Sequence, residues 1–199
     1  MADKKLTELT NYTPPIDTDI LPIVDITTST TKKITWANVK AALKTYFDTQ
    51  YPTLNVAARA YLSADQDNIA GGGAGYYQIN LDSESYDIGG NFASYCFTTP
   101  VAGYYLVTGQ VTFEGADMSA GNYSADIYVD PAGAGALAVV AENFNYFATA
   151  AKYVCIPVTD IIYCTAGDKI YLYCSTADTD VDIESGAAYT FMSVVLLGV

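Results

Sequence analysis

The 199-residue chain has no histidine, and this absence narrows its possible functions at once. Histidine is the commonest general base and metal-binding side chain, so Ser-His and Cys-His nucleophile pairs are excluded. Paired carboxylates could in principle hydrolyse a glycan. The acidic residues, however, mostly stand beside Gly, Ser and Thr, and no spacing singles out a pair. We therefore expect a protein that is not an enzyme and that needs no cofactor.

Basic residues are also scarce, mainly in the second part of the chain. Residues 1–59 contain seven of the nine Lys and Arg residues and six of the 22 acidic residues, whereas residues 60–199 contain two bases and 16 acids. This second region would repel a polyanion or an anionic membrane surface. Nucleic acid is therefore not an expected partner. The 51% hydrophobic content indicates a folded core and not a disordered acidic chain.

Long apolar runs are missing as well. The first residues lack the roughly 7–15-residue apolar stretch of a secretory signal, and Val194–Leu197 is too short to cross a bilayer. We expect a soluble protein that is made in a cytoplasm and does not insert into a membrane. The four cysteines lack zinc-type spacing and stand in apolar, strand-like contexts, which favours buried free thiols over disulfides. They are Cys96, Cys155, Cys164 and Cys174.

The first fifty residues predict two short strands, Asp19–Asp25 and Lys32–Thr35, followed by the only clear helix of the sequence, Trp36–Phe47. Thr35 is a suitable N-cap for that helix. A hairpin and one helix bury too little surface to be stable alone. The helix carries an apolar stripe at three- and four-residue spacing, which we expect to be an attachment surface covered by the head, a sister chain or a larger assembly. The stripe consists of Trp36, Val39, Leu43 and Phe47.

A change of period marks the head of the protein. Pro52 blocks continuation of the helix, and the glycine-rich stretch Gly71–Gly75 follows before polar and apolar residues begin to alternate near Tyr76. These patterns predict an N-terminal segment at 1–59, a linker at 60–75 and a β-sandwich or barrel at 76–199. In Gly103–Phe113 the expected buried face carries Tyr105, Val107, Val111 and Phe113. Further strands are expected near Tyr123–Val129, Ala136–Val140, Tyr153–Val158, Ile170–Cys174 and Thr190–Leu197.

One acidic segment near the C-terminus is a candidate metal site. On a strand, its four carboxylates would point to one face and repel each other unless water or a hard cation screens them. Oxygen ligands of this kind suit calcium, although the segment lacks the glycine of an EF-hand loop. A calcium site and a solvated loop at the tip of the head both stay open. The four residues are Asp178, Asp180, Asp182 and Glu184.

Eighteen tyrosines are many for a chain of this length. Exposed tyrosines can stack on sugars, so a glycan-binding surface is one interpretation. Several of them fall in strand alternation, however, where β-propensity and core or interface packing are sufficient to explain them. These are Tyr105, Tyr128, Tyr153, Tyr171 and Tyr173.

Three stretches of the head resemble the globular domain of the C1q and tumour-necrosis-factor-like superfamily. Phe97, Gly103 and Tyr105 match that family's signature of Phe, five residues, Gly, one residue and Tyr. Gly167–Leu172 is similar to the Gly-Asp opening of a late strand in the family, and Tyr189–Leu197 is similar to its closing strand.

The sequence departs from the family pattern at Val107, where an aromatic residue is usual, and at Ser193, where glycine is usual. The resemblance implies a mainly β chain whose head is a C1q/TNF-like jelly-roll sandwich, a fold of ten strands that forms homotrimers about a three-fold axis. An unrelated sandwich with similar aromatic alternation is the alternative.

The N-terminal segment has a resemblance of its own. The order of Lys4–Thr10, Asp19–Asp25, Lys32–Thr35 and the helix is similar to the leading module of bacteriophage fibre and decoration proteins, which attaches the chain to the virion. The two resemblances imply a trimeric structural protein at the virion surface, assembled in the bacterial host cytoplasm. It would be a capsid-decorating or head-fibre component or a short tail fibre, with other capsid or tail proteins as partners. The alternative is a receptor-binding adhesin whose head recognises a host-surface glycan or protein.

Overall fold

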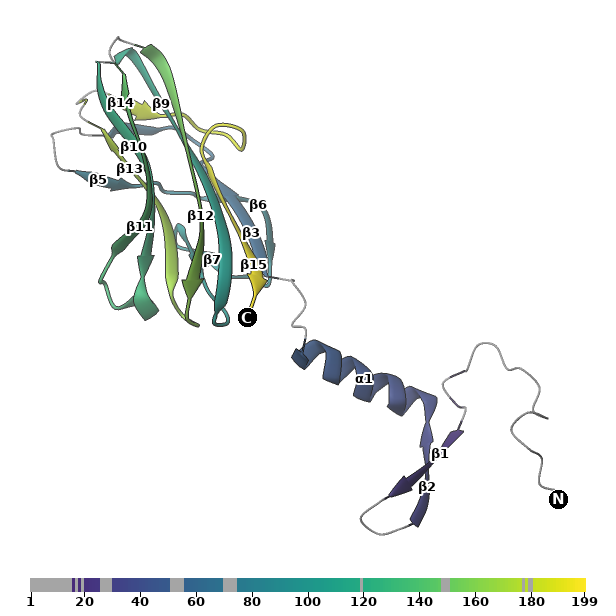
Figure 1. Cartoon of the computed structure of the whole chain (residues 1–199). Coiled ribbons are helices and arrows are strands. Elements are labelled where there is room, and N and C mark those ends of the chain that lie inside the picture. Colours follow the sequence, from purple (N-terminus) through teal and green to yellow (C-terminus); the bar gives the residue numbers. More distant parts are fainter. Residues whose placement is uncertain are drawn as a thin grey trace. The chain divides into compact units, whose positions relative to one another are not determined.

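A computed structural model describes residues 16, 18, 20–25, 30–50, 56–69, 75–118, 120–147, 151–176, 178 and 181–199. The chain divides into two compact units, Met1–Pro52 and Thr53–Val199. Figure 1 shows the first unit as a hairpin and a helix and the second as a two-layer arrangement of strands.

The N-terminal unit contains the predicted hairpin and helix. Strands β1 (Ile20–Asp25) and β2 (Thr30–Thr35) pair antiparallel, and helix α1 (Trp36–Gln50) begins directly after β2. The Thr35 hydroxyl oxygen accepts a hydrogen bond from the backbone N–H of Asn38 at 3.3 Å, which is the geometry of an N-cap. The expected N-cap at Thr35 is therefore confirmed. Within the described part of the chain, no helix is long and apolar enough to span a bilayer.

The head consists of two antiparallel sheets packed face to face (Figure 1). We call the larger one sheet I; its strand order is β4 (Gln66–Ile69), β14 (Val181–Ile183), β9 (Gly103–Met118), β15 (Phe191–Gly198), β3 (Ala57–Tyr61) and β6 (Ser83–Ile88), with β12 (Ala151–Cys164) on the other edge of β9. Sheet II has the order β11 (Ala138–Phe147), β10 (Gly121–Asp130), β13 (Lys169–Thr176), β8 (Cys96–Thr98) and β7 (Phe92–Ala93), and β5 (Tyr76–Gln78) also pairs with β13. A 3-10 turn, η2 (Pro131–Gly133), follows β10.

The head begins earlier in the sequence than expected. Strand β3 lies between β15 and β6, with Phe191 opposite Tyr61 and Ile88 opposite Ala57. Residues 57–61 and 66–69 therefore belong to strands of sheet I, whereas residues 70–74 of the linker expected at 60–75 lie outside the described residues. The sequence gives no strand signal here because Ala58 and Ala60, which the structure buries, are small residues without strand preference.

The core lies between the two sheets and follows the predicted alternation on β9. The four residues expected on its buried face, Tyr105, Val107, Val111 and Phe113, are all fully buried. The signature residues of the resemblance also have structural roles. The rings of Phe97 and Tyr105 pack edge to face at 6.1 Å between centroids, and the Tyr105 hydroxyl donates a hydrogen bond to the Val101 carbonyl at 2.7 Å.

Three of the four cysteines are buried free thiols, as expected. Cys155 is exposed, which corrects the prediction for that residue. It alternates on β12 with Val154 and Ile156, which enter the core, so its thiol must point outward from sheet I.

Candidate functional site

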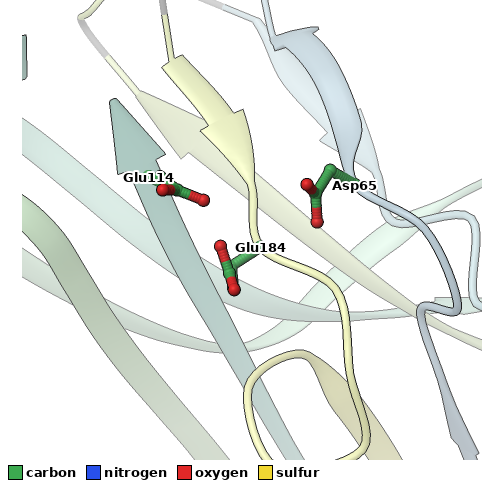
Figure 2. Close-up of side chains that lie close together, drawn as sticks. All are labelled: Asp65, Glu114 and Glu184. Carbon is green, nitrogen blue, oxygen red and sulfur yellow. The ribbon is translucent and has the colours of Figure 1, made fainter. Parts of the chain in front are cut away.

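Three carboxylates from distant parts of the sequence meet at one end of sheet I. Asp65 stands just before β4, Glu114 lies on β9 and Glu184 follows β14, and one oxygen from each lies within 4.8 Å of the others. Figure 2 shows the three side chains pointing toward one another. The pairing of β14 explains their meeting, because Ile183 stands opposite both Gln66 on β4 and Phe113 on β9. We call these residues the acidic trio.

Hydrogen bonds link Glu114 to Glu184 and connect the trio to Tyr153 and Ser185. A hydrogen bond with Glu114 raises the pKa of Glu184 to about 7, and the same bond lowers the pKa of Glu114. The Tyr153 hydroxyl donates to Glu114 Oε1 at 2.7 Å, which further lowers the Glu114 pKa. Hydrogen bonds from Ser185 lower the pKa of Asp65. One of them runs from the Ser185 backbone N–H to Asp65 Oδ1 at 2.7 Å. The Glu114–Glu184 pair therefore keeps a proton to a higher pH than a separate glutamate would.

The sequence indicates four carboxylates as a candidate calcium ligand set, and one of them belongs to the trio. Of that set, Glu184 is the member that joins the trio, while Asp182 is half-buried on β14 and Asp180 lies outside the described residues. Asp178 is buried and accepts a hydrogen bond from the Tyr123 hydroxyl at 3.3 Å. Sequence spacing could not reveal Asp65 and Glu114, because only strand pairing brings them to Glu184. Three carboxylate oxygens at this spacing have the chemistry to hold a hard cation.

A second feature of sheet I is the apolar side that it turns away from the core. Tyr104 on β9 stands opposite Tyr163 on β12, and the two rings contact edge to face at 5.2 Å between centroids. In the next row, Leu106 on β9 lies between Ile161 on β12 and Val195 on β15. Directly opposed residues in antiparallel strands share a face. These rows therefore form one continuous surface.

Most large side chains of this surface are exposed. Relative exposure is 55% for Tyr104, 60% for Tyr163 and 56% for Ile161. Leu197 on β15 and the β6 residues Tyr86 and Ile88 extend the exposed apolar area toward the other edge of the sheet. We call this surface the apolar face; it comprises Tyr86, Ile88, Tyr104, Leu106, Ile161, Tyr163, Val195 and Leu197.

One basic side chain lies beside the apolar face. The Arg59 guanidinium sits 4.0 Å from the centroid of the Phe191 ring and donates a hydrogen bond to the Ala187 carbonyl at 2.5 Å. Its Nε atom is buried and has no hydrogen-bond partner among the described residues.

A contiguous exposed apolar surface such as the apolar face is typical of an interface with another protein.

The helical stripe predicted as an attachment surface lies in the N-terminal unit. Trp36 and Val39 are half-buried there, whereas Leu43 and Phe47 are exposed. The stripe thus offers apolar surface at the C-terminal half of α1. Its role in attachment stays a prediction.

Comparisons with known proteins give information on the fold. No family model matches the sequence, and no curated protein matches it. The structure is similar to that of murine APRIL, with a TM-score of 0.53 and 12% identity over 71% of this chain and 99% of the other. It is also similar to Eiger TNF from S. frugiperda, with a TM-score of 0.53 and 12% identity over 72% of this chain and 92% of the other. The head therefore has the C1q/TNF-like jelly-roll fold that the sequence resemblance implies.

Proposed function

We propose that the chain is a non-enzymatic structural protein of a bacteriophage virion, in which the head forms a homotrimer and the N-terminal unit attaches it to capsid or tail proteins. The observation that carries the trimer is the apolar face of sheet I. Exposed Tyr104, Tyr163 and Ile161 would leave a large apolar area in water if the head stayed a monomer. A second and third copy can cover that area by hydrophobic burial.

The charge of the head is consistent with burial on this side. Residues 60–199 carry two bases and 16 acids. The row of Tyr104 and Tyr163 on the apolar face contains no acidic side chain, and neither does the row of Leu106, Ile161 and Val195. Repulsion between acidic heads would therefore act mainly around the interface and not within it. Such an arrangement allows strongly acidic subunits to associate.

The attachment role rests on the N-terminal unit. The hairpin of β1 and β2 and the helix α1 belong to a compact unit distinct from the head, and Leu43 and Phe47 on α1 are exposed. A unit this small gains stability when its apolar stripe is buried against a partner. The order of its elements is the one that resembles the leading module of phage fibre and decoration proteins.

Two measurements test the proposal. Light scattering coupled to size-exclusion chromatography should give three times the monomer mass at micromolar concentration, and a monomer mass would contradict the trimer. Gold-labelled antibody against the head should decorate intact particles of the encoding phage. Particles that carry a deletion of residues 1–52 in this protein should lose the label. If the antibody does not label wild-type particles, the virion role is contradicted.

A receptor-binding head is the second candidate, favoured by the tyrosines exposed on sheet II. Purified head would then bind host cells directly, which a decoration protein need not do. Binding of the full-length protein to host cells, absent for non-host bacteria, distinguishes the two roles.

A further inference from the structure

Four tyrosines gather on the side of sheet II that faces away from the core. Tyr128 lies on β10, Tyr171 and Tyr173 on β13, and Tyr76 on β5. The Tyr128 ring is 4.6 Å from that of Tyr173 and 5.7 Å from that of Tyr76, measured between centroids, and Tyr171 is 6.2 Å from Tyr173. Tyr76 is 53% exposed, while the other three are half-buried. We call this group the tyrosine cluster.

The tyrosine cluster surrounds a buried carboxylate. Asp126 lies two residues before Tyr128 on β10 and so points to the same side of the sheet, opposite Tyr173. Tyr76 pairs with Ser175 on β13. This pair lies one row from Asp126, and Tyr128 lies one row from Asp126 in the opposite direction. The contact between the Tyr76 and Tyr128 rings therefore crosses the Asp126 row. Asp126, in the row that this contact crosses, is 0% exposed.

Only one of the two carboxylate oxygens of Asp126 has a hydrogen-bond partner among the described residues. The Ser124 hydroxyl lies 2.9 Å from Asp126 Oδ2, and Ser124 is itself held 2.8 Å from the Ser175 hydroxyl. Asp126 Oδ1 is buried without a hydrogen-bond partner among the described residues. A buried acceptor without a donor is costly, and more so when it is ionised. A group supplied from outside the chain would remove this cost.

The electrostatics of the site favour a cation. Glu142 on β11 stands directly opposite Asp126, and like charges in that position repel. Burial raises the pKa of Asp126 to about 7, and Glu142 adds to the rise, while the bond from Ser124 opposes it. Lys169 is the only base in β5, β10, β11 and β13, and it pairs with Asp130, four residues along β10 or roughly 13 Å away. None of these strands therefore places a base beside Asp126.

We infer that Asp126 and the tyrosine cluster form a binding site for a primary alkylammonium group. Its N–H groups would donate to Oδ1, and its charge and methylene groups would lie against the rings of Tyr76, Tyr128 and Tyr173. A sugar hydroxyl could also donate to Oδ1, but it would leave the Asp126–Glu142 repulsion uncompensated. Access is by displacement of Tyr76, the exposed member of the cluster on a three-residue strand. The site lies on sheet II, so it does not depend on trimer formation through sheet I.

The ammonium group could come from a lysine side chain of a partner protein or from a small amine. NMR titration of the full-length protein with Nα-acetyl-lysine methylamide and with butylammonium tests both sources. Each probe should shift the backbone amide signals of Asp126 and the ring signals of the tyrosine cluster with the same saturation curve. If only the lysine compound binds, the peptide backbone contributes, and the source is a protein.

Two variants and a matched control connect binding to the site. Asp126→Asn keeps the shape but removes the charge, and it should weaken binding by about tenfold or more, the loss expected for a hydrogen bond to a charged group. Tyr76→Leu keeps an apolar cover without the aromatic face and should weaken binding by roughly threefold to fivefold. Asp67→Asn removes an exposed carboxylate on β4 of sheet I and should change affinity by less than about twofold.

Several results would overturn the inference. Equal binding by wild type and Asp126→Asn would do so. The absence of any signal shift at roughly 50 mM probe would also do so. Stronger binding of tetramethylammonium than of butylammonium would show that no hydrogen bond forms at Oδ1. Saturable binding of glucose or N-acetylglucosamine at the tyrosine cluster, with no effect of the amines, would identify a saccharide site instead.

Discussion

Tyr104 and Tyr163 stand opposite each other on β9 and β12, with ring centroids 5.2 Å apart and more than half of each side chain exposed. The two rings contact each other and are still open to solvent, on the side of the sheet that faces away from the core. This arrangement is typical of a surface that binds a partner. Together with Ile161 and Leu197 they locate the expected interface on sheet I.

The apolar face can be tested with a matched pair of leucines. Leu197 on the face is 45% exposed, and Leu137, in the loop before β11, is 44% exposed. Leu197→Lys should lower the trimer mass toward the monomer mass in light scattering, because a charge would be buried in the interface. Leu137→Lys should leave the trimer intact. Equal behaviour of the two variants would remove sheet I from the interface.

Gly103 provides a test of the resemblance at a residue of its signature. A Cβ atom at Gly103 would collide with the backbone carbonyl oxygen of Gly198 and lie 2.9 Å from Leu196 Cδ1. Gly103→Ala should lower the free energy of unfolding by about 1–3 kcal/mol, as overpacking does. At Gly198 a Cβ would meet nothing within 4 Å, so Gly198→Ala should cost less than about 0.5 kcal/mol. Urea unfolding at one protein concentration measures both, and similar losses would contradict the packing described.

The start of the head can be tested by truncation. A fragment of residues 53–199 retains β3 and should show the circular dichroism of a folded β protein with a cooperative melt. A fragment of residues 62–199 lacks β3, which joins β15 to β6, and should not fold. Limited proteolysis of the full-length protein should accordingly leave a head that still contains Ala57. A stable head beginning at residue 62 or later would contradict the role of β3.

Asp126 should make stability depend on pH. Its folded-state pKa is raised from 3.8 to about 7, so between these values the folded state holds a proton that the unfolded state has released. The free energy of unfolding contributed by this group therefore falls as pH rises from about 4 to 7. Asp126→Asn should show a shallower slope and be more stable than wild type at pH 8 by about 1–3 kcal/mol, the cost of an unsatisfied buried charge. An unchanged slope in chemical denaturation across this range would contradict the burial of Asp126; Asp67→Asn serves as the control.

The acidic trio gives a separate pH and metal test. The raised pKa of Glu184, caused first by its bond with Glu114, makes stability fall as pH rises toward about 7 and the pair loses its shared proton. Glu184→Gln keeps a hydrogen-bond donor and should raise the Tm at pH 8. If the trio holds calcium, millimolar calcium should raise the Tm of wild type at pH 8 and leave that of Glu184→Gln unchanged. No shift in wild type would rule out a stabilising calcium site.

Much of the fold was predictable because local patterns determine it. The alternation of Tyr105, Val107, Val111 and Phe113 indicates a strand with one buried face whatever surrounds it. The three- and four-residue spacing of the stripe on α1 and the cap at Thr35 identify the helix in the same way. These signals depend on backbone geometry, which each short segment carries by itself.

Other features arise only when strands from distant parts of the chain pair. Ala58 and Ala60 carry no strand signal, so the place of β3 in sheet I depends on its neighbours β15 and β6. Asp65, Glu114 and Glu184 become neighbours only because β14 bridges β4 and β9. Asp126 alternates like a solvent-facing residue in the sequence, yet it is fully buried beside the contact between Tyr76 and Tyr128 from the neighbouring rows. The sequence alone thus determined the strands, the helix and the uneven charge, while tertiary pairing decided which side chains meet, because contact between distant residues depends on register and not on local pattern.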